Sequence, residues 1–373
     1  MATETNRSRC DSAHADVSEP LTRRGFLGVA GATVISLAAP LAQRALASSK
    51  ADSSGGMLIV LPEAGREPYF AAIDSAQDQI SIEICVLEDP QILQHLQATL
   101  QRGVSVRAIV DFGKYNQLES ERDHLAKYLT SAGGELHLSN PIFPRSFPKI
   151  ILIDSDLVLY GSACLDQTTF LRYRDFATTS TDQQVLADLH RLFENDWAYS
   201  APVGEQASAF NPTPPISSSD LIISPVNSGA RLVGLYQSAQ QTLDVYTELL
   251  GNPTLESELA AAVSRGVRVR LISPERVAGG SMEVQERQLA SLTALAGAGA
   301  SVHVNGGVNV GVPYMHARAA VVDGQTAYLG SVSLSPDSIT GNREMGLIVQ
   351  DQALVTQLEA QFESDYNLQT RKF

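Results

Sequence analysis

The 373-residue chain predicts an α/β protein of two similar lobes, each a mixed sheet flanked by helices, related by a pseudo-twofold axis. Three observations lead to this prediction. Short motifs of the first half recur in the same order in the second half. Within each half, alternating apolar segments and amphipathic segments follow one another, as in strands and helices of an α/β unit. A Pro- and Ser-rich stretch separates the halves, as expected of a linker.

The duplication is visible in matched motifs whose offset grows slowly along the chain. The offset is 163 residues near the start of the repeat and 169 residues from the middle onward, which indicates short loop insertions in the second copy. The clearest matches are Ser75-Ala76-Gln77 with Ser238-Ala239-Gln240, Arg102-Gly103-Val104 with Arg265-Gly266-Val267, Asp154 with Asp323, and Gly161-Ser162 with Gly330-Ser331. A single match carries no weight, but an ordered series predicts two copies of one structural unit.

Each element of the first copy follows from its local pattern. Residues 79–86 alternate between isoleucine and polar residues, which is typical of a half-buried strand. Residues 90–102 carry apolar side chains at helical spacing, and Gly103 ends the helix. The other predicted elements are strands over 104–111, 135–139, 150–154 and 157–160 and helices over 118–132 and 183–197. The second copy repeats this order from 221 to 366.

The N-terminal segment predicts export. Arg23-Arg24 opens a mild apolar stretch over 26–41, and Ala45-Leu46-Ala47 supplies small residues for a cleavage site. We therefore expect a twin-arginine signal, no stable membrane span after its removal, and a periplasmic or extracellular protein. The predicted organisation is a signal over 1–47, a first lobe over 48–201, a linker over 202–220 and a second lobe over 221–373.

Charge and cysteine content limit the partners and the redox chemistry. With 27 Lys+Arg against 41 Asp+Glu, the net charge of −14 argues against binding of long nucleic acid, whose phosphates require a basic surface. A monomer is expected. Cys85 and Cys164 remain after signal removal; the sequence is equally compatible with a disulfide and with two isolated buried thiols.

The repeated motif carries the chemistry. The first copy reads Lys149-x4-Asp154-x6-Gly161-Ser162, and the second reads His316-Ala317-Arg318-x4-Asp323-x6-Gly330-Ser331. This pattern resembles the phospholipase D superfamily, whose members carry HxKxxxxD followed by a GSxN turn once in each lobe. The resemblance covers most of the chain after residue 47 and implies a phosphodiester site where the two lobes meet.

The resemblance also implies roles for individual residues. His316 attacks phosphorus and forms a phosphohistidine, and a carboxylate, Glu344 or Asp175, orients its ring. No metal and no cofactor are implied, and the substrate is a phosphodiester such as a phospholipid. Positive charge and hydroxyl groups hold the phosphoryl oxygens, and the motif aspartates support the fold. The implied phosphoryl contacts are Lys149, Arg318, Ser162, Ser331 and Ser333, and the structural aspartates are Asp154 and Asp323.

Four positions depart from the superfamily pattern. Phe147 stands where the first motif has His, Arg318 replaces Lys, and Cys164 and Ser333 replace the Asn of each turn. Because Phe transfers no proton, the alternative to an enzyme is a non-catalytic protein that binds a phosphoryl group or serves as a scaffold.

Three further questions concern the same site. Lys149 and Arg318 are expected to meet across the lobes, either with an anion between them or each paired with a local carboxylate. His137 or His303 could replace the missing histidine as the proton donor, and Cys164 could act as a nucleophile.

Overall fold

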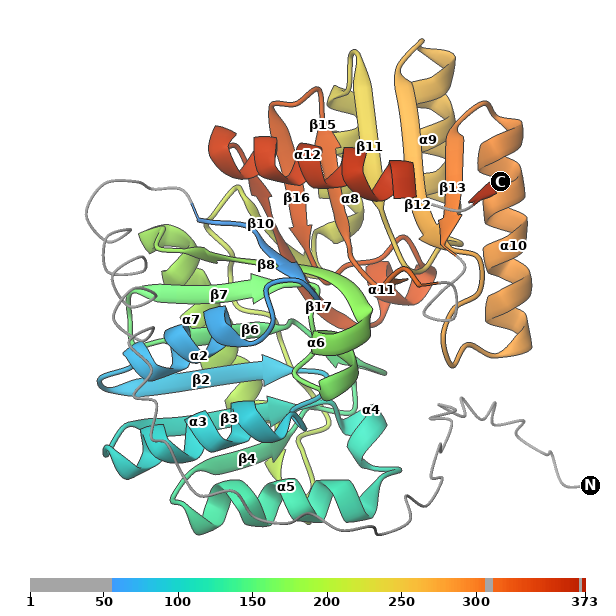
Figure 1. The fold of residues 1–373 in the computed structure, drawn as a ribbon. Coiled ribbons are helices and arrows are strands. Elements are labelled where there is room, and N and C mark those ends of the chain that lie inside the picture. Colours follow the sequence, from blue (N-terminus) through green and yellow to red (C-terminus); the bar gives the residue numbers. More distant parts are fainter. Residues whose placement is uncertain (1–55, 306–310, 369–370) are drawn as a thin grey trace, which may run out of the picture.

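The computed structural model describes residues 56–305, 311–368 and 371–373. The predicted signal peptide over 1–47 lies outside these residues. Two nine-stranded mixed sheets form the two lobes, as predicted (Figure 1). In each sheet three neighbouring strands run parallel, and the other strands of the same lobe pair antiparallel. The ninth strand of each sheet comes from the other lobe and pairs in parallel.

The two sheets have the same strand order, displaced by one copy of the repeat. In order, the first contains β1 (Ile59–Leu61), β8 (Tyr173–Ser180), β7 (Leu157–Gly161), β6 (Ile150–Ile153), β2 (Gln79–Ile84), β3 (Ser105–Val110), β4 (Glu135–Leu138) and β9 (Ala201–Pro202). The second contains β10 (Leu221–Ser224), β17 (Arg343–Val349), β16 (Thr326–Gly330), β15 (Ala319–Val322), β11 (Thr242–Tyr246), β12 (Arg268–Pro274), β13 (Ser301–Asn305) and β18 (Arg371–Lys372).

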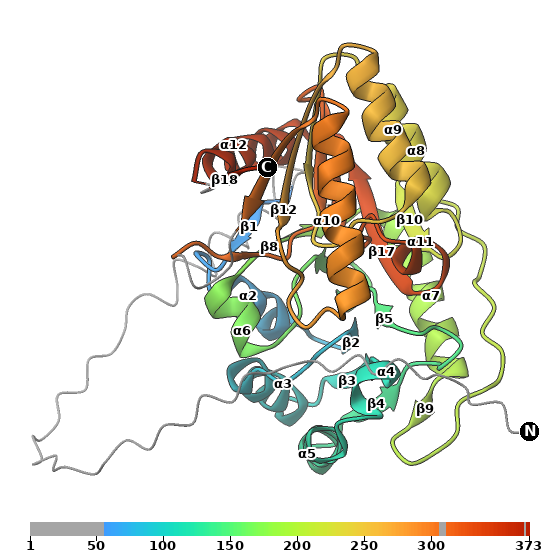
Figure 2. The same cartoon turned by 90° about the vertical axis from the view of Figure 1, so that its right-hand side faces the viewer.

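Helices cover both faces of each sheet. Those of the first lobe are α2 (Glu67–Ser75), α3 (Pro90–Gln101), α4 (Phe112–Tyr115), α5 (Glu119–Ser131), α6 (Gln167–Arg172) and α7 (Gln183–Tyr199). Those of the second are α8 (Ser228–Ser238), α9 (Pro253–Ser264), α10 (Met282–Gly297), α11 (Pro336–Thr340) and α12 (Gln352–Leu368). Figure 2 shows α5 and α9 at opposite ends of the molecule.

Three apolar cores hold the layers together. One packs α2, α3 and α5 on the outer face of the first sheet, and another packs α8, α9 and α10 on the second. The third lies between the sheets and contains side chains from both, together with the closing helices α7 and α12. The lobes therefore share a core, which places the interface site on a rigid base.

Each lobe lends a short strand to the other sheet. β14 (Tyr314–Met315) pairs in parallel with β8, and β5 (Ser146–Phe147) pairs in parallel with β17. These exchanges obey the pseudo-twofold relation and deliver each motif to the edge of the opposite lobe. The first copy of the motif therefore faces residues of the second lobe, and the second copy faces residues of the first.

Candidate active site at the lobe interface

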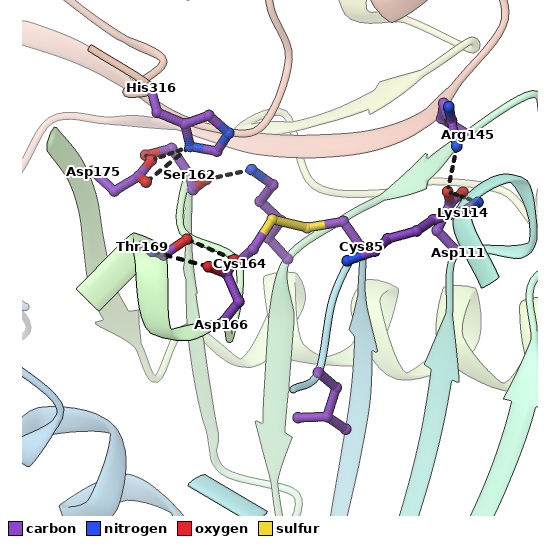
Figure 3. Close-up of a disulfide and its surroundings, with 12 residues drawn as sticks. Cys85, Asp111, Lys114, Arg145, Ser162, Cys164, Asp166, Thr169, Asp175 and His316 are labelled. Atoms are coloured by element: carbon purple, nitrogen blue, oxygen red, sulfur yellow. Dashed lines mark hydrogen bonds and ion pairs between the residues drawn. A yellow bond between two sulfur atoms is a disulfide. The ribbon is translucent and has the colours of Figure 1, made fainter. Parts of the chain in front are cut away.

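His316 lies directly after β14, and its ring is held by the first lobe. Its Nδ1 is 2.8 Å from Oδ2 of Asp175 on β8 (Figure 3). A proton on Nδ1 donates to this carboxylate, which leaves a lone pair on Nε2. Burial and the neighbouring cations Arg318 and Lys149 hold the pKa of His316 well below its usual range. A neutral imidazole with a free Nε2 is the form that a nucleophile requires.

The carboxylate partner of His316 differs from the one expected within its own lobe. Glu344 belongs to the same copy of the repeat, but the exchange of strands brings Asp175 to His316 and sets Glu344 opposite Phe147. Of the two carboxylates that the sequence offers, Asp175 is thus the one in contact. The choice depends on how the lobes cross, and nothing local in the sequence encodes it.

Ser162 links Asp175 to the turn of the first motif. Its hydroxyl donates to Oδ1 of Asp175 at 2.5 Å and accepts from the amide of Phe176 at 3.0 Å. Burial raises the pKa of Asp175 to about 6, although Lys149 and Arg318 oppose the shift. Ser331 likewise accepts from the amide of Met345 at 3.1 Å. Each hydroxyl is thus hydrogen-bonded to the strand that follows its motif, β8 for Ser162 and β17 for Ser331. A contact of either hydroxyl with phosphate stays a prediction.

The two motif cations have different surroundings. Arg318 donates to the hydroxyl of Ser333 at 2.9 Å and forms a close ion pair with Glu248. Lys149 is buried, and its Nζ donates to the carbonyl oxygen of Ser162. Among the residues that the structure describes, Lys149 has no carboxylate within ion-pair distance, so the expected pairing with a local acid is found for Arg318 alone. Burial and the nearby Arg318 charge lower the pKa of Lys149 to about 7.

Glu248 is a site residue that the sequence analysis missed. It follows β11, is 8% exposed, and accepts a hydrogen bond from the hydroxyl of Tyr314 at 2.9 Å. Its Oε2 lies 3.7 Å from Nε2 of His316. The carboxylate therefore stands on the side of the ring where a phosphoryl group would be attacked. No motif marks this position, because only the fold brings the end of β11 beside the second motif.

Phe147 fills the place of the missing histidine, and Glu344 remains behind it. The two residues are register partners between β5 and β17. Oε1 of Glu344 accepts from Ser338 at 2.9 Å and from Asn342 at 2.8 Å. Oε2 is buried and has no hydrogen-bond partner within the described ranges. Burial raises the pKa of Glu344 to about 7.

A disulfide joins Cys85 to Cys164 beside the first motif (Figure 3). This settles the pairing that the sequence left open and rules out Cys164 as a nucleophile in this form of the protein. By the repeat offsets, the two cysteines correspond to Glu248 and Ser333 of the second lobe. The disulfide therefore occupies the place that the Glu248–Arg318–Ser333 network occupies in the other lobe.

The remaining motif residues lie away from His316. Asp154 accepts from the amides of residues 77–79, and Asp323 accepts in the same way from residues 240–242, which ties each strand end to the turn before the first parallel strand. His137 and His303 stack on Trp197 and Tyr366 of the closing helices. These two histidines contact the helices rather than the motif, so proton donation by either of them has no geometric support.

Comparison with known proteins agrees with this geometry. The family model described as "Cardiolipin synthase, PLD-like domain" matches residues 69–197 and 232–366, more than half of the chain. The chain is 22% identical to the probable cardiolipin synthase YwiE of Bacillus subtilis over 324 residues, covering 79% of this chain and 63% of that protein. It is 24% identical to cardiolipin synthase A of Yersinia pseudotuberculosis over 310 residues, covering 74% and 60%. The chain thus spans 60–63% of the length of these relatives.

Two solved structures share the fold. Phosphatidylserine synthase of Haemophilus influenzae superposes with a TM-score of 0.66 at 15% identity, covering 89% of this chain and 92% of that one. Polyphosphate kinase of Porphyromonas gingivalis superposes with a TM-score of 0.62 at 17% identity, covering 86% and 49%. Among the described residues, no helix has the length and apolar character needed to cross a membrane. The duplicated sheets, the crossed motifs and the family match lead to one conclusion: the chain belongs to the phospholipase D-like domain family of the cardiolipin synthases.

Proposed function

We propose that the protein is an exported phosphodiesterase of the phospholipase D type, acting on a phospholipid or similar diester through a phosphohistidine on His316. The observation that carries this proposal is the Asp175–His316 pair, which presents a neutral Nε2 beside two buried cations. Arg318 and Lys149 supply positive charge where negative charge builds on the phosphoryl oxygens. The names of the relatives support a phospholipid substrate.

In the proposed first step, Nε2 of His316 attacks phosphorus and the bond to the leaving alcohol breaks. In the second, water or another alcohol attacks the phosphohistidine and releases His316, so hydrolysis and transfer share one intermediate. Asp175 stabilises the charge that develops on the ring during both steps. Glu248 lies where the phosphoryl group would bind, so substrate has to compete with it for Arg318.

The test is hydrolysis of bis(4-nitrophenyl) phosphate by the protein from residue 48 onward, compared with His316→Ala. The nitrophenolate leaves without protonation, so the assay tolerates the absence of the first histidine. Turnover that is lost in the variant supports the proposal, and a phosphorylated His316 trapped by rapid quench identifies the intermediate. Turnover equal in both proteins would contradict it.

Phe147 favours a second candidate, a phosphoryl-binding protein without turnover. That candidate predicts phosphate binding by calorimetry, weakened by Lys149→Ala with Arg318→Ala, and no diester cleavage. Export is proposed from Arg23-Arg24 and is compatible with the Cys85–Cys164 disulfide, which persists in oxidising compartments. Replacing both arginines by lysine should leave the protein in the cytoplasm, as shown by cell fractionation.

A further inference from the structure

Because Phe147 stands in place of the first-motif histidine, that position has no side chain that could protonate the leaving group. Two candidates near the site are disfavoured. Burial raises the pKa of the Tyr173 hydroxyl to about 12, so it is a weak donor at neutral pH. Glu344 is 2% exposed, with one carboxyl oxygen fixed by Ser338 and Asn342, and it lies opposite Phe147 in the strand register.

Lys149 is linked to the reacting groups by hydrogen bonds. Ser162 connects it to the nucleophile, because the Ser162 carbonyl accepts from Nζ while its hydroxyl donates to Asp175, which holds His316. The backbone of Lys149 has a φ of 56°, the left-handed region that costs a non-glycine residue energy and is frequent at functional sites. Its counterpart Arg318 is not among the described residues with a positive φ. The chain therefore holds Lys149 in a special conformation at this point.

Lys149 and Arg318 are suited to different roles, proton transfer and phosphoryl binding. Arg318 is held by Glu248 and Ser333, and its planar guanidinium is suited to binding phosphoryl oxygens. A buried lysine without a carboxylate partner among the described residues can exist in both protonation states. Exchange between these states is what an acid–base catalyst requires.

We propose that Lys149 is the proton donor that takes over the role of the missing histidine at position 147; this inference rests on the proposed function. The lone pair of His316 Nε2 forms the N–P bond, the P–O bond breaks with its electron pair on oxygen, and the ammonium of Lys149 gives that oxygen a proton. In the second step the attacking water or alcohol returns a proton to the Lys149 amine. The N–P bond then breaks, and its electron pair returns to Nε2.

The electrostatics of the pocket fit this cycle. The charged and titratable groups that act on Lys149 are Arg318, Asp175, Glu248 and Glu344, and His316 lies in the same field. Burial and Arg318 favour the neutral amine, whereas the carboxylates and an incoming phosphoryl anion favour the ammonium. Binding of the substrate therefore favours the protonated form of Lys149, and departure of the product favours the neutral amine.

The experiment compares Lys149→Arg with wild type on methyl 4-nitrophenyl phosphate and methyl phenyl phosphate. Arginine keeps the charge but does not give up a proton. We expect kcat for the phenyl ester to fall roughly 10²-fold or more, and kcat for the nitrophenyl ester to fall less than about tenfold. Wild-type turnover of the phenyl ester should decline as the pH rises past the loss of the ammonium, and Lys149→Arg should abolish this limb.

Controls separate the outcomes. Lys127→Arg makes the same exchange at an exposed position on α5 and should leave both rates unchanged. An equal fall on both esters in Lys149→Arg would overturn the inference while leaving the proposed function intact. The leaving-group pattern appearing in Glu344→Gln instead would assign the acid to Glu344 and also overturn it. Absence of His316-dependent turnover on either ester in wild type would overturn the proposed function, and the inference with it.

Discussion

Asp175 of the first lobe holds His316 of the second, with Oδ2 of the carboxylate 2.8 Å from Nδ1 of the ring. The contact exists because β14 leaves its own sheet and pairs with β8. It fixes the ring and the tautomer together, since Nδ1–H donates to the carboxylate and Nε2 stays unprotonated. The nucleophile of one lobe is therefore set by a side chain of the other.

Asp175→Asn should abolish most activity without unfolding the protein. The amide can donate to Nδ1 and so favours the tautomer with its proton on Nε2, which removes the nucleophilic lone pair. We expect kcat for bis(4-nitrophenyl) phosphate to fall by roughly 10²–10⁴-fold. Asp78→Asn, at an exposed position, serves as the control. Retention of near wild-type kcat in Asp175→Asn would argue against this role of the carboxylate.

Phe147→His should increase turnover of diesters with poor leaving groups. The new imidazole would face Glu344, whose Oε2 is buried without a partner in the described structure. We expect kcat for methyl phenyl phosphate to rise at least about tenfold, with a smaller effect on the nitrophenyl ester. Phe147→Leu is the control, because it removes the phenyl ring without adding an imidazole. The gain should disappear in Phe147→His with Glu344→Gln; a gain that persists there would contradict the pairing.

Glu248→Gln should strengthen binding of inorganic phosphate. The substitution leaves the buried Arg318 without its carboxylate, which costs about 3–5 kcal/mol of unfolding free energy and is offset when an anion takes the vacated place. Calorimetry should show at least about tenfold tighter phosphate binding, and phosphate should raise the melting temperature more than in wild type. Glu286→Gln, an exposed position on α10, changes the net charge equally. Weaker phosphate binding in Glu248→Gln would contradict competition between Glu248 and phosphate for Arg318.

The stability of the protein should depend on pH through Glu344. Its folded-state pKa is raised from 4.5 to about 7 by burial, so the folded state binds more protons than the unfolded chain between these values. Glu344 therefore makes its full contribution to the free energy of unfolding below about pH 4.5. This contribution is lost as the pH rises towards 7, by up to about 1.4 kcal/mol per pH unit. Glu344→Gln should remove this slope in urea unfolding measured from pH 4.5 to 7. Identical slopes in both proteins would contradict the buried, protonated carboxyl.

Reduction of the Cys85–Cys164 disulfide should destabilise the first lobe. The two cysteines are 79 residues apart in sequence, and closing a loop of this size stabilises the folded state by about 4.5 kcal/mol in the chain-entropy description. Urea unfolding of Cys85→Ser with Cys164→Ser should show this loss, and wild type with reductant should match it. Equal stability with and without reductant, once thiol titration confirms reduction, would be the contrary result.

The sequence predicts the architecture of each lobe well and the connections between lobes poorly. Strands such as β2 and helices such as α3 follow from local periodicity and agree with the structure within a few residues. No strand is predicted from the sequence over 173–180, where Arg174 and Asp175 stand among few apolar residues. In the structure both are buried in the strand, and Arg174 pairs with Asp365 on α12 of the other lobe.

The same limit applies to the site. His316, Lys149 and Arg318 are identified by the motif, but Glu248 comes from a strand end that no motif marks. The choice of Asp175 over Glu344 as the partner of His316 depends on the exchange of β5 and β14, which pair across lobes over two residues each. Segments this short carry no periodicity, so the pairing is specified by the assembled fold alone.

The crossed strands have a counterpart in two buried ion pairs, Arg174 with Asp365 and Arg343 with Asp196. In each pair the arginine precedes a site carboxylate on one lobe, and the aspartate belongs to the closing helix of the other. A chain cut within 203–220 would break both ion pairs, although Arg174 would keep its contact with Glu63 of its own lobe. Each half therefore completes the interior of the other, and the linker holds together two parts that share one core.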